Sequence, residues 1–218
     1  MTVVAGVDDA GRGAIIGPLV IAGIRIADAD EKKLVDMGVK DSKLLSAAVR
    51  RRLYPMIRQV ADGIAIRRIK PASIDEYVLT GRKLRKLNYL EALTMAKVID
   101  ELRPDVAYVD ASDVNPTRYG SDVANALATR IKIFSRHKAE LLYPVVAAAS
   151  IIAKVERDRA VEELAVRHGP LGSGYPSDDK TRRFLRMWLL SKGEEPPFSR
   201  RSWRTWDSIR SSTLDAFE

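Results

Sequence analysis

Short apolar segments and longer amphipathic segments alternate along the chain. The apolar segments are rich in Val and Ile, and one of them, "GIAIRRIK", alternates hydrophobic and polar positions as a half-buried strand does. These features predict strands at residues 3–7, 18–26, 63–70, 105–110 and 131–135. Helical periodicity predicts helices at about residues 47–59, 74–102, 122–130, 144–168 and 181–191.

The connections predict how these strands pair. The first three strands are expected to form an antiparallel meander, whereas helices separate the later strands, which favours parallel pairing. The predicted fold is α/β, with a mixed five-stranded sheet flanked by helices. After residue 168 a loop rich in Gly, Pro and Ser, "GPLGSGYPSDD", precedes the last helix and an irregular basic tail. We expect a main domain at residues 1–170, with residues 171–218 forming a small helical appendage packed on it.

Acidic residues follow three of the predicted strands. Asp8 and Asp9 end the first strand, Asp110 ends the fourth, and Glu140 follows the fifth. The carboxyl ends of parallel strands meet at one edge of a sheet, so Asp8 and Asp110 should be neighbours. Asp9 would point to the opposite face of a regular strand, but a turn at the following glycines is expected to bring it round. Such a cluster of carboxylates is stable only with hard cations, which predicts Mg²⁺ or Mn²⁺.

Composition narrows the functional classes. The chain has 218 residues with a net charge of +8 and no cysteine, so disulfides, thiolate metal sites and thiol nucleophiles are excluded. The basic excess favours a polyanionic partner, and nucleic acid is the first choice. No leader peptide is apparent, and the longest apolar run, residues 14–26, is too short and interrupted to span a membrane. A cytoplasmic protein without membrane contact is expected.

Five sequence blocks in a fixed order resemble the ribonuclease HII (type 2 ribonuclease H) family. They are "GVDDAGRGAIIGPLVIAG", "VKDSKLLS", "YVDASDVNP", "HKAELLYPVVAAASIIAKVERDR" and "GSGYPSD". The resemblance implies a ribonuclease H-like fold for the main domain and dependence on Mg²⁺ or Mn²⁺. It also implies cleavage of the RNA strand of RNA–DNA hybrids and at ribonucleotides embedded in duplex DNA. A two-metal-ion mechanism would leave 3′-hydroxyl and 5′-phosphate ends.

The family's catalytic and metal-binding acids fall on Asp8, Asp9, Asp110 and Glu140. Two of these positions depart from the usual pattern, since the family usually has Glu in place of Asp9 and Asp in place of Glu140. Charge is kept, but the reach of each side chain changes by one methylene group. The related ribonuclease HIII can carry Glu at the fourth position, yet it usually has an extra N-terminal domain, for which this chain has no room.

The resemblance also implies substrate-binding residues. The family reads the ribonucleotide 2′-hydroxyl with a Gly-Arg-Gly motif, here Gly11, Arg12 and Gly13, together with a loop tyrosine, here Tyr175. Glycines allow backbone amides to approach a nucleotide closely, although a tight turn explains them equally well. Phosphate contacts are predicted for three further residues, Lys43, Ser150 and Lys154.

Other readings stay open from the sequence alone. A basic nucleic-acid-binding module would make the acids structural, and a DNA resolvase would share the fold but have no 2′-hydroxyl to read. His137 suits a structural hydrogen bond better than proton transfer. The tail "SRRSWRTWDSIR" suits a nucleic-acid backbone, but at least one of its tryptophans, Trp203 or Trp206, should pack on the domain. A monomer is expected, with a sliding-clamp contact through the tail left open.

Overall fold

The computed structural model describes residues 1–39, 45–80 and 86–214. The chain divides into two compact units, and each is described here by itself. The first unit consists of Met1–Ala10, Val20–Arg68 and Arg85–Glu156, and the second consists of Gly11–Leu19, Ile69–Leu84 and Arg157–Glu218.

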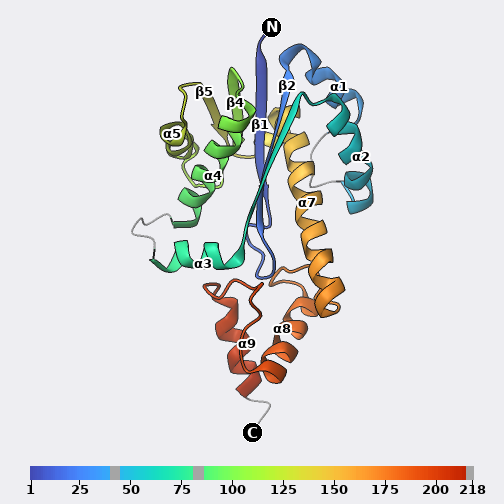
Figure 1. The fold of residues 1–218 in the computed structure, drawn as a ribbon, viewed down its shortest axis with the longest axis vertical. Helices are drawn as coiled ribbons and strands as arrows, with labels where there is room; N and C mark the ends of the chain where they lie inside the picture. Colours follow the sequence, from blue (N-terminus) through green and yellow to red (C-terminus); the bar gives the residue numbers. More distant parts are fainter. Residues whose placement is uncertain (40–44, 81–85, 215–218) are drawn as a thin grey trace. The chain divides into compact units, whose positions relative to one another are not determined.

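The first unit is built on a five-stranded mixed sheet in the order β3-β2-β1-β4-β5 (Figure 1). Strand β1 pairs antiparallel with β2 and parallel with β4, which in turn pairs parallel with β5. The mixed α/β sheet predicted from the connections is therefore confirmed. The strands are β1 (Val3–Ala10), β2 (Leu19–Ala27), β3 (Gly63–Ile69), β4 (Val106–Asp110) and β5 (Lys132–Arg136).

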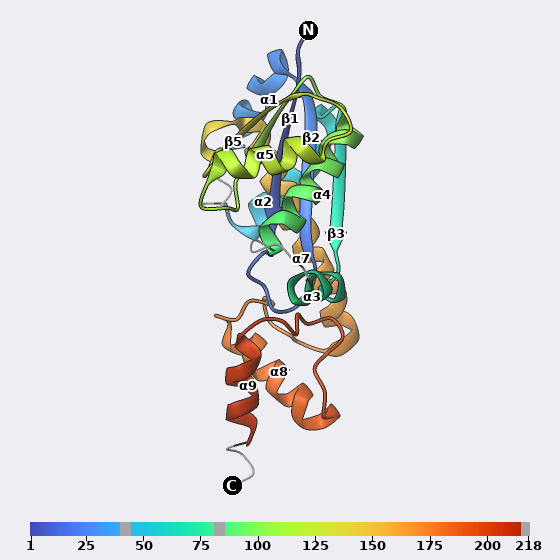
Figure 2. The same cartoon turned by 90° about the vertical axis from the view of Figure 1, so that its left-hand side faces the viewer.

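Helices cover both faces of this sheet. Helices α4 and α5 lie on one face, and α2 with the first part of α7 lies on the other (Figures 1 and 2). A one-turn 3₁₀ helix, Asp28–Asp30, and the short helices α1 and α6 join the larger elements. The helices of this unit are α1 (Glu31–Asp36), α2 (Ala47–Val60), α4 (Lys86–Leu102), α5 (Pro116–Ala126), α6 (Ala139–Leu142) and α7 (Pro144–His168), whose last residues belong to the second unit.

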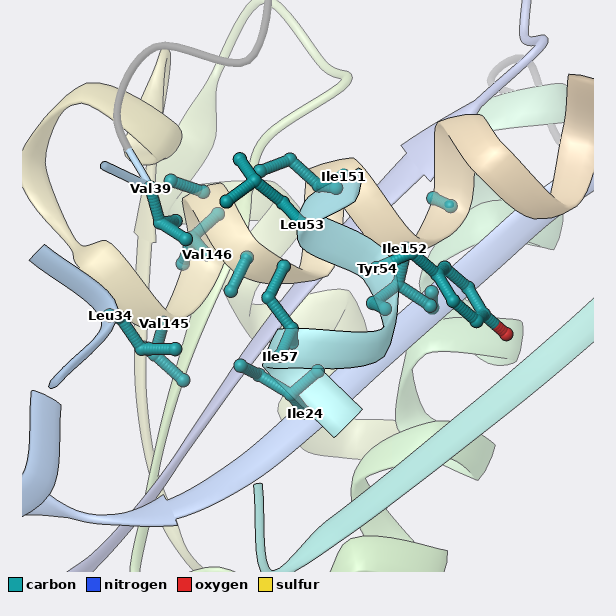
Figure 3. Packing of buried hydrophobic residues seen from close by; sticks show 14 of the residues in the cluster. Ile24, Leu34, Val39, Leu53, Tyr54, Ile57, Val145, Val146, Ile151 and Ile152 are labelled. Atoms are coloured by element: carbon teal, nitrogen blue, oxygen red, sulfur yellow. The ribbon is translucent and has the colours of Figure 1, made fainter. Parts of the chain in front are cut away.

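The core on the α7 side follows from the alternation of β2. Every second residue of β2, such as Ile24, is buried and packs against apolar side chains of α2 and α7, among them Ile57 and Val146 (Figure 3). Gly6 of β1 lets α7 approach closely, because a Cβ atom at this position would lie 2.4 Å from the backbone carbon of Val145. This close approach fixes the height at which α7 crosses β1.

The second unit has its own small core. Helices α8 and α9 pack with the end of α7 and with the segment Gly11–Leu19. The buried apolar residues of this core are Ile15, Ile16, Val161, Leu171, Leu185, Trp206 and Ile209. The helices of the unit are α3 (Pro71–Thr80), α8 (Asp179–Lys192) and α9 (Thr205–Leu214).

Three predicted elements need correction. The single helix expected at residues 74–102 is described as two helices, α3 and α4, and the sequence places the weak helix former Gly81 between them. The helix expected at residues 122–130 is α5, which begins earlier because Asn115 caps it and Pro116 occupies its first turn. The tail expected to be irregular contains α9, whose Trp206 and Ile209 lie three residues apart on one buried face.

The search for membrane-spanning segments covers the same residues. Within residues 1–39, 45–80 and 86–214, no helix is both long and apolar enough to cross a membrane.

Candidate active site

Asp8 lies near the end of β1, on the face covered by α7. Its side chain is only 5% exposed. Its Oδ1 atom accepts a hydrogen bond from the backbone N–H of Asp9 at 2.7 Å, and its carboxylate also accepts one from the hydroxyl of Ser150 on α7. Because α7 packs closely on β1 at Gly6, Ser150 of α7 lies near enough to Asp8 to orient its carboxylate.

Asp9 lies in regular β structure, which corrects one expectation. Strand β1 continues to Ala10, and Asp9 pairs with Ile21 of β2, so no turn brings its side chain round. The strand persists because β2 continues to supply backbone partners up to Val20. The Oδ1 atom of Asp9 accepts a hydrogen bond from the Ser112 hydroxyl at 3.2 Å.

The loop that carries Ser112 is anchored by a buried acid. Asp113 is 2% exposed and accepts hydrogen bonds from the backbone N–H of Asn115 and the side-chain amide of Asn88, both at 2.9 Å. Ser112 is therefore carried on a fixed loop directly after β4, at the strand end where the acids were expected.

Asp110 is tied to the chain segment that precedes Glu140. Asp110 is the last residue of β4, and its Oδ1 atom accepts the backbone N–H of Ala139 at 2.9 Å. Lys138, just before, adopts the left-handed conformation with φ of 54°, which is uncommon outside glycine and costs energy. Glu140 follows Ala139 in the first turn of α6 and is 4% exposed. The backbone is thus bent sharply at the point where the fourth acid enters.

The acids interact electrostatically. Burial raises the pKa of Asp8 well above its usual value, and the charges of Asp9 and then Asp110 raise it further, while the hydrogen bond from Ser150 opposes the rise. Asp9 and Asp110 are therefore both within electrostatic reach of Asp8, and a divalent cation would relieve the repulsion at Asp8.

The donor set fits such a cation in type. Carboxylate oxygens are the ligands that Mg²⁺ and Mn²⁺ prefer, and buried, mutually repelling carboxylates gain from a bound cation. Among the side chains that the structure describes, however, no three acidic or histidine residues are placed together so as to hold one ion. Asp8, Asp9, Asp110 and Glu140 as metal ligands thus stay a prediction, supported by their ligand type and by the pKa of Asp8.

The predicted phosphate-binding residues are placed unevenly. Ser150 is 1% exposed and is engaged with Asp8, so it serves the carboxylate directly. Lys154 lies one helical turn further along α7 and is half-buried. Lys43 lies outside the described residues.

The Gly-Arg-Gly motif belongs to the second unit. Gly11 is buried with φ of 86°, whereas Gly13 is exposed and has open space where a side chain would be. The segment is tied to the predicted tyrosine loop, because the backbone N–H groups of Ile15 and Ile16 both donate to the carbonyl of Gly174, at 2.8 and 3.1 Å.

Tyr175 follows Gly174 directly and is held by a buried arginine. The guanidinium of Arg157 on α7 lies 4.5 Å from the centre of the Tyr175 ring, and it also donates to the carbonyl of Ser173. Gly174 has φ of 81°, and its N–H donates to the Thr181 hydroxyl at 2.9 Å. The structure thus brings the Gly-Arg-Gly segment and Tyr175 together within one unit.

Asp178 closes this loop. Its carboxylate accepts the backbone N–H groups of Ser173 at 2.6 Å and Lys180 at 3.0 Å. The hydrogen bonds from Ser173, ahead of the others, lower the pKa of Asp178 to about 2. The same carboxylate caps α8, so one residue fixes both the loop and the helix start.

Several contacts around the predicted site residues were not predicted from the sequence. Ser112, Arg157 and Arg200 all make them, yet none stands out from its neighbours, since basic and hydroxyl residues are frequent here. The expected packing of at least one tail tryptophan is confirmed, because Trp206 is fully buried. His137 is exposed, and its two ring nitrogens lie 3.3 and 3.4 Å from the carbonyl oxygens of Ala111 and Val114, which agrees with the structural hydrogen-bonding role expected for it.

Comparisons with known proteins agree with the fold. The family model described as ribonuclease HII matches residues 5–206. A ribonuclease HII from Cenarchaeum symbiosum is 47% identical over 201 residues, which cover 92% of this chain and 95% of that protein. The crystal structure of a ribonuclease H2 from Pyrococcus horikoshii OT3 has a TM-score of 0.88 at 39% identity, covering 97% of this chain and 99% of the other. A ribonuclease HII from Archaeoglobus fulgidus, solved in complex with PCNA, has a TM-score of 0.86 at 41% identity, covering 98% and 100%.

Proposed function

Since the chain belongs to the ribonuclease HII family, whose members cleave the RNA of RNA–DNA hybrids, we propose that it also cuts duplex DNA at single embedded ribonucleotides. It is a metal-dependent ribonuclease and acts as an endonuclease. The observation that carries the finer proposal is that Ile15 and Ile16, which closely follow the Gly-Arg-Gly motif, donate to the carbonyl of Gly174 in the Tyr175 loop. Recognition of a single 2′-hydroxyl requires the Gly-Arg-Gly motif and Tyr175 to lie close together, whereas a DNA resolvase has no 2′-hydroxyl to recognise.

In this proposal, the four acids hold the metal and act in hydrolysis. Asp8, Asp9, Asp110 and Glu140 would bind two Mg²⁺ or Mn²⁺ ions. Bound ions would supply Lewis-acid chemistry for phosphodiester hydrolysis, activating a water and stabilising the leaving 3′-oxygen, and the products would carry 3′-hydroxyl and 5′-phosphate ends.

The protein's own hydrogen bonds set the direction of three of these carboxylates. The Ser150 hydroxyl donates to Asp8, the Ser112 hydroxyl to Asp9, and the Ala139 N–H to Asp110. Each donor leaves further lone pairs of its carboxylate for a cation, because an ionised carboxylate has about four acceptor positions. The donors therefore orient the carboxylates and leave acceptor positions available for a cation.

Recognition of the ribonucleotide is assigned to the second unit, and phosphate contacts are assigned to residues of both units. The backbone of Gly11–Gly13 and the Tyr175 ring would read the ribonucleotide, and Arg12, Lys43 and Lys154 would contact phosphates. Ser150 is assigned to both tasks, because its hydroxyl borders Asp8.

Further expectations complete the proposal. We assign residues 1–170 to the catalytic domain and residues 171–218 to a C-terminal loop, helix and basic tail, and we place a monomeric enzyme in the cytoplasm. The relative from Archaeoglobus fulgidus forms a complex with PCNA, which supports a proposed clamp contact through the C-terminal tail of this chain. Residues 215–218 of that tail lie outside the described residues.

The deciding experiment uses one labelled DNA duplex that contains a single ribonucleotide, with an all-DNA duplex of the same sequence and a long RNA–DNA hybrid as controls. Each is incubated with Mg²⁺, with Mn²⁺ and with a chelator. We expect metal-dependent cutting of the hybrid and of the single-ribonucleotide duplex, and none of the all-DNA duplex. Cutting of the hybrid alone would refute the finer proposal while leaving the family activity intact.

A further inference from the structure

Arg200 is a fully buried arginine whose guanidinium faces the backbone of the Gly-Arg-Gly segment. Its side chain is 0% exposed. Its Nη1 atom donates to the carbonyl oxygen of Arg12 at 2.7 Å, and its Nη2 atom donates to that of Gly11 at 2.7 Å. The Nε and Nη2 atoms also donate to the carbonyl of Gly17, at 3.3 and 3.2 Å. One planar fork of donors thus gathers three carbonyl groups from a single loop.

The geometry of the peptide bond determines the direction in which the N–H groups of this loop point. In a trans peptide, the C=O of one residue and the N–H of the next point in opposite directions, and the described residues contain no cis peptide. The carbonyls of Gly11 and Arg12 are turned toward Arg200. The N–H groups of Arg12 and Gly13 are therefore turned away from it, toward the side where Gly13 is exposed.

Arg200 is itself fixed by its neighbours in the chain. Its guanidinium lies 4.9 Å from the ring centre of Trp203. Its backbone N–H donates to the carbonyl of Ile15 at 2.8 Å, and the N–H of Gly17 donates to the carbonyl of Phe198 at 2.9 Å. The segment 198–200 therefore runs along residues 15–17 as a short antiparallel bridge.

An acid from α3 holds the other side of this segment. Asp75 is 8% exposed, and its carboxylate accepts the backbone N–H groups of Arg201 at 2.8 Å and Ser202 at 2.9 Å, and the Ser202 hydroxyl at 2.6 Å. The guanidinium of Arg200 consequently has little freedom to move away from the loop.

We propose that Arg200 is a positioning residue for ribonucleotide recognition, which presents the N–H groups of Arg12 and Gly13 to the substrate. This rests on the proposed function of the Gly-Arg-Gly segment. Burying a charged guanidinium is costly, and the cost is offset here by hydrogen bonds that no shorter or neutral side chain can make together. Lysine keeps the charge but is a point donor on a flexible stem, so it cannot hold three carbonyls in one plane.

The test compares Arg200→Lys with Arg201→Lys. Arg201 is the adjacent arginine, but its side chain is 51% exposed and pairs with Glu195, so it is a matched control outside the loop. The dissociation constants of a single-ribonucleotide duplex and an all-DNA duplex are measured in a chelator, where nothing is cleaved. The readout is their ratio, the preference for the ribonucleotide.

We expect Arg200→Lys to reduce this preference about tenfold, the effect of one misdirected hydrogen bond, with all-DNA affinity kept. Arg201→Lys should retain the wild-type preference. A general loss of structure would weaken both duplexes alike, so equal losses, or an unchanged preference in Arg200→Lys, would overturn the inference.

Two further results separate the possible failures. A wild-type protein that cuts the hybrid but shows no preference would refute the proposed role of the loop itself, and not only that of Arg200. If Arg200→Lys does not fold, Asp75→Ala replaces it, since this change releases residues 201 and 202 without touching the loop. It should lower the preference in the same direction, and an unchanged preference there would overturn the inference.

Discussion

The two units hold their proposed functional groups by opposite means. In the first unit the groups are negative side chains that repel one another, and burial and neighbouring charges raise the pKa of Asp8. In the second unit the groups are backbone amides and one aromatic ring, and buried positive side chains, Arg157 and Arg200, hold them through carbonyl oxygens. The first arrangement is under electrostatic strain without a cation, whereas in the second the charged arginines donate to carbonyl groups of the protein.

Mutations in the two units should therefore affect different properties of the protein. Changing an acid should remove turnover while leaving the fold intact, because the acid stabilises the fold little or not at all. Changing the second unit should alter discrimination between substrates, and stability with it, because the same hydrogen bonds serve both. Four changes test this contrast.

The largest effect is expected from Asp8→Asn. We expect the single-turnover rate on the hybrid to fall well beyond tenfold, a barrier increase above about 1.4 kcal/mol, with hybrid affinity largely kept because phosphate contacts supply it. The folded-state pKa of Asp8 is raised, so its ionised form costs stability at neutral pH, and the neutral Asn should not lower Tm in a chelator. A rate above one tenth of the wild-type rate, or a clear drop in Tm, would contradict the expected difference between the two units.

The next effect concerns Tyr175. Tyr175→Ala removes the ring that Arg157 covers, so cutting at a single ribonucleotide should fall about tenfold more than cutting of a long hybrid, a difference of about 1.4 kcal/mol. Tyr175→Phe keeps the ring and removes only the hydroxyl, which isolates the stacking contribution. The measurement is kcat/KM on both substrates for all three proteins. Equal losses on both would reduce Tyr175 to an anchor of its loop.

A smaller effect is expected from restoring the usual family pattern with Asp9→Glu and Glu140→Asp. Mg²⁺ demands near-ideal geometry, so the redistributed reach of these two side chains should favour Mn²⁺ over Mg²⁺. We expect the double exchange to narrow the Mn²⁺/Mg²⁺ ratio of single-turnover rates, and each single exchange to be worse than the double, because ligands of one site are coupled.

The control for this exchange is Ser112→Ala, which removes the hydrogen bond to Asp9 without changing any acid. It should alter the rates with both metals similarly. A constant Mn²⁺/Mg²⁺ ratio across the exchanges would show that the two departures are independent of metal choice.

The smallest effect is on stability and comes from Asp178→Asn. The folded-state pKa of Asp178 is lowered to about 2, so its ionised form stabilises the fold above its ordinary pKa, and this contribution is lost as the pH falls toward 2. At pH 7 the change should lower Tm by about 2–4 °C, the shift that roughly 1 kcal/mol gives in a chain of this size.

Thermal unfolding at several pH values checks this, with Asp179→Asn as the neighbouring control. The difference in Tm between wild type and Asp178→Asn should shrink as the pH falls below 4. A difference that does not change with pH would assign the effect to packing in place of charge.

The mixed pairing of the strands and the acids near their ends followed from the sequence alone. Strands β1, β2, β4 and β5 lie close to the predicted ranges, since runs of Val and Ile with short connections leave few alternative arrangements. Asp8 and Asp110 lie at neighbouring strand ends, because parallel pairing of β1 with β4 brings their carboxyl ends to one edge. These features could be predicted because they depend on short stretches of the sequence.

The tertiary structure alone decided which polar residues are inside. Arg200 and Arg201 are adjacent in a basic tail, yet one is fully buried against carbonyl groups 183 to 189 positions away and the other is half exposed. A sequence reads both as charged surface residues, because burial of a guanidinium becomes favourable only when distant carbonyls are brought to it. The acids could be found by reading along the chain, whereas the arginines that hold the Gly-Arg-Gly segment and the Tyr175 loop could be found only after the chain had folded.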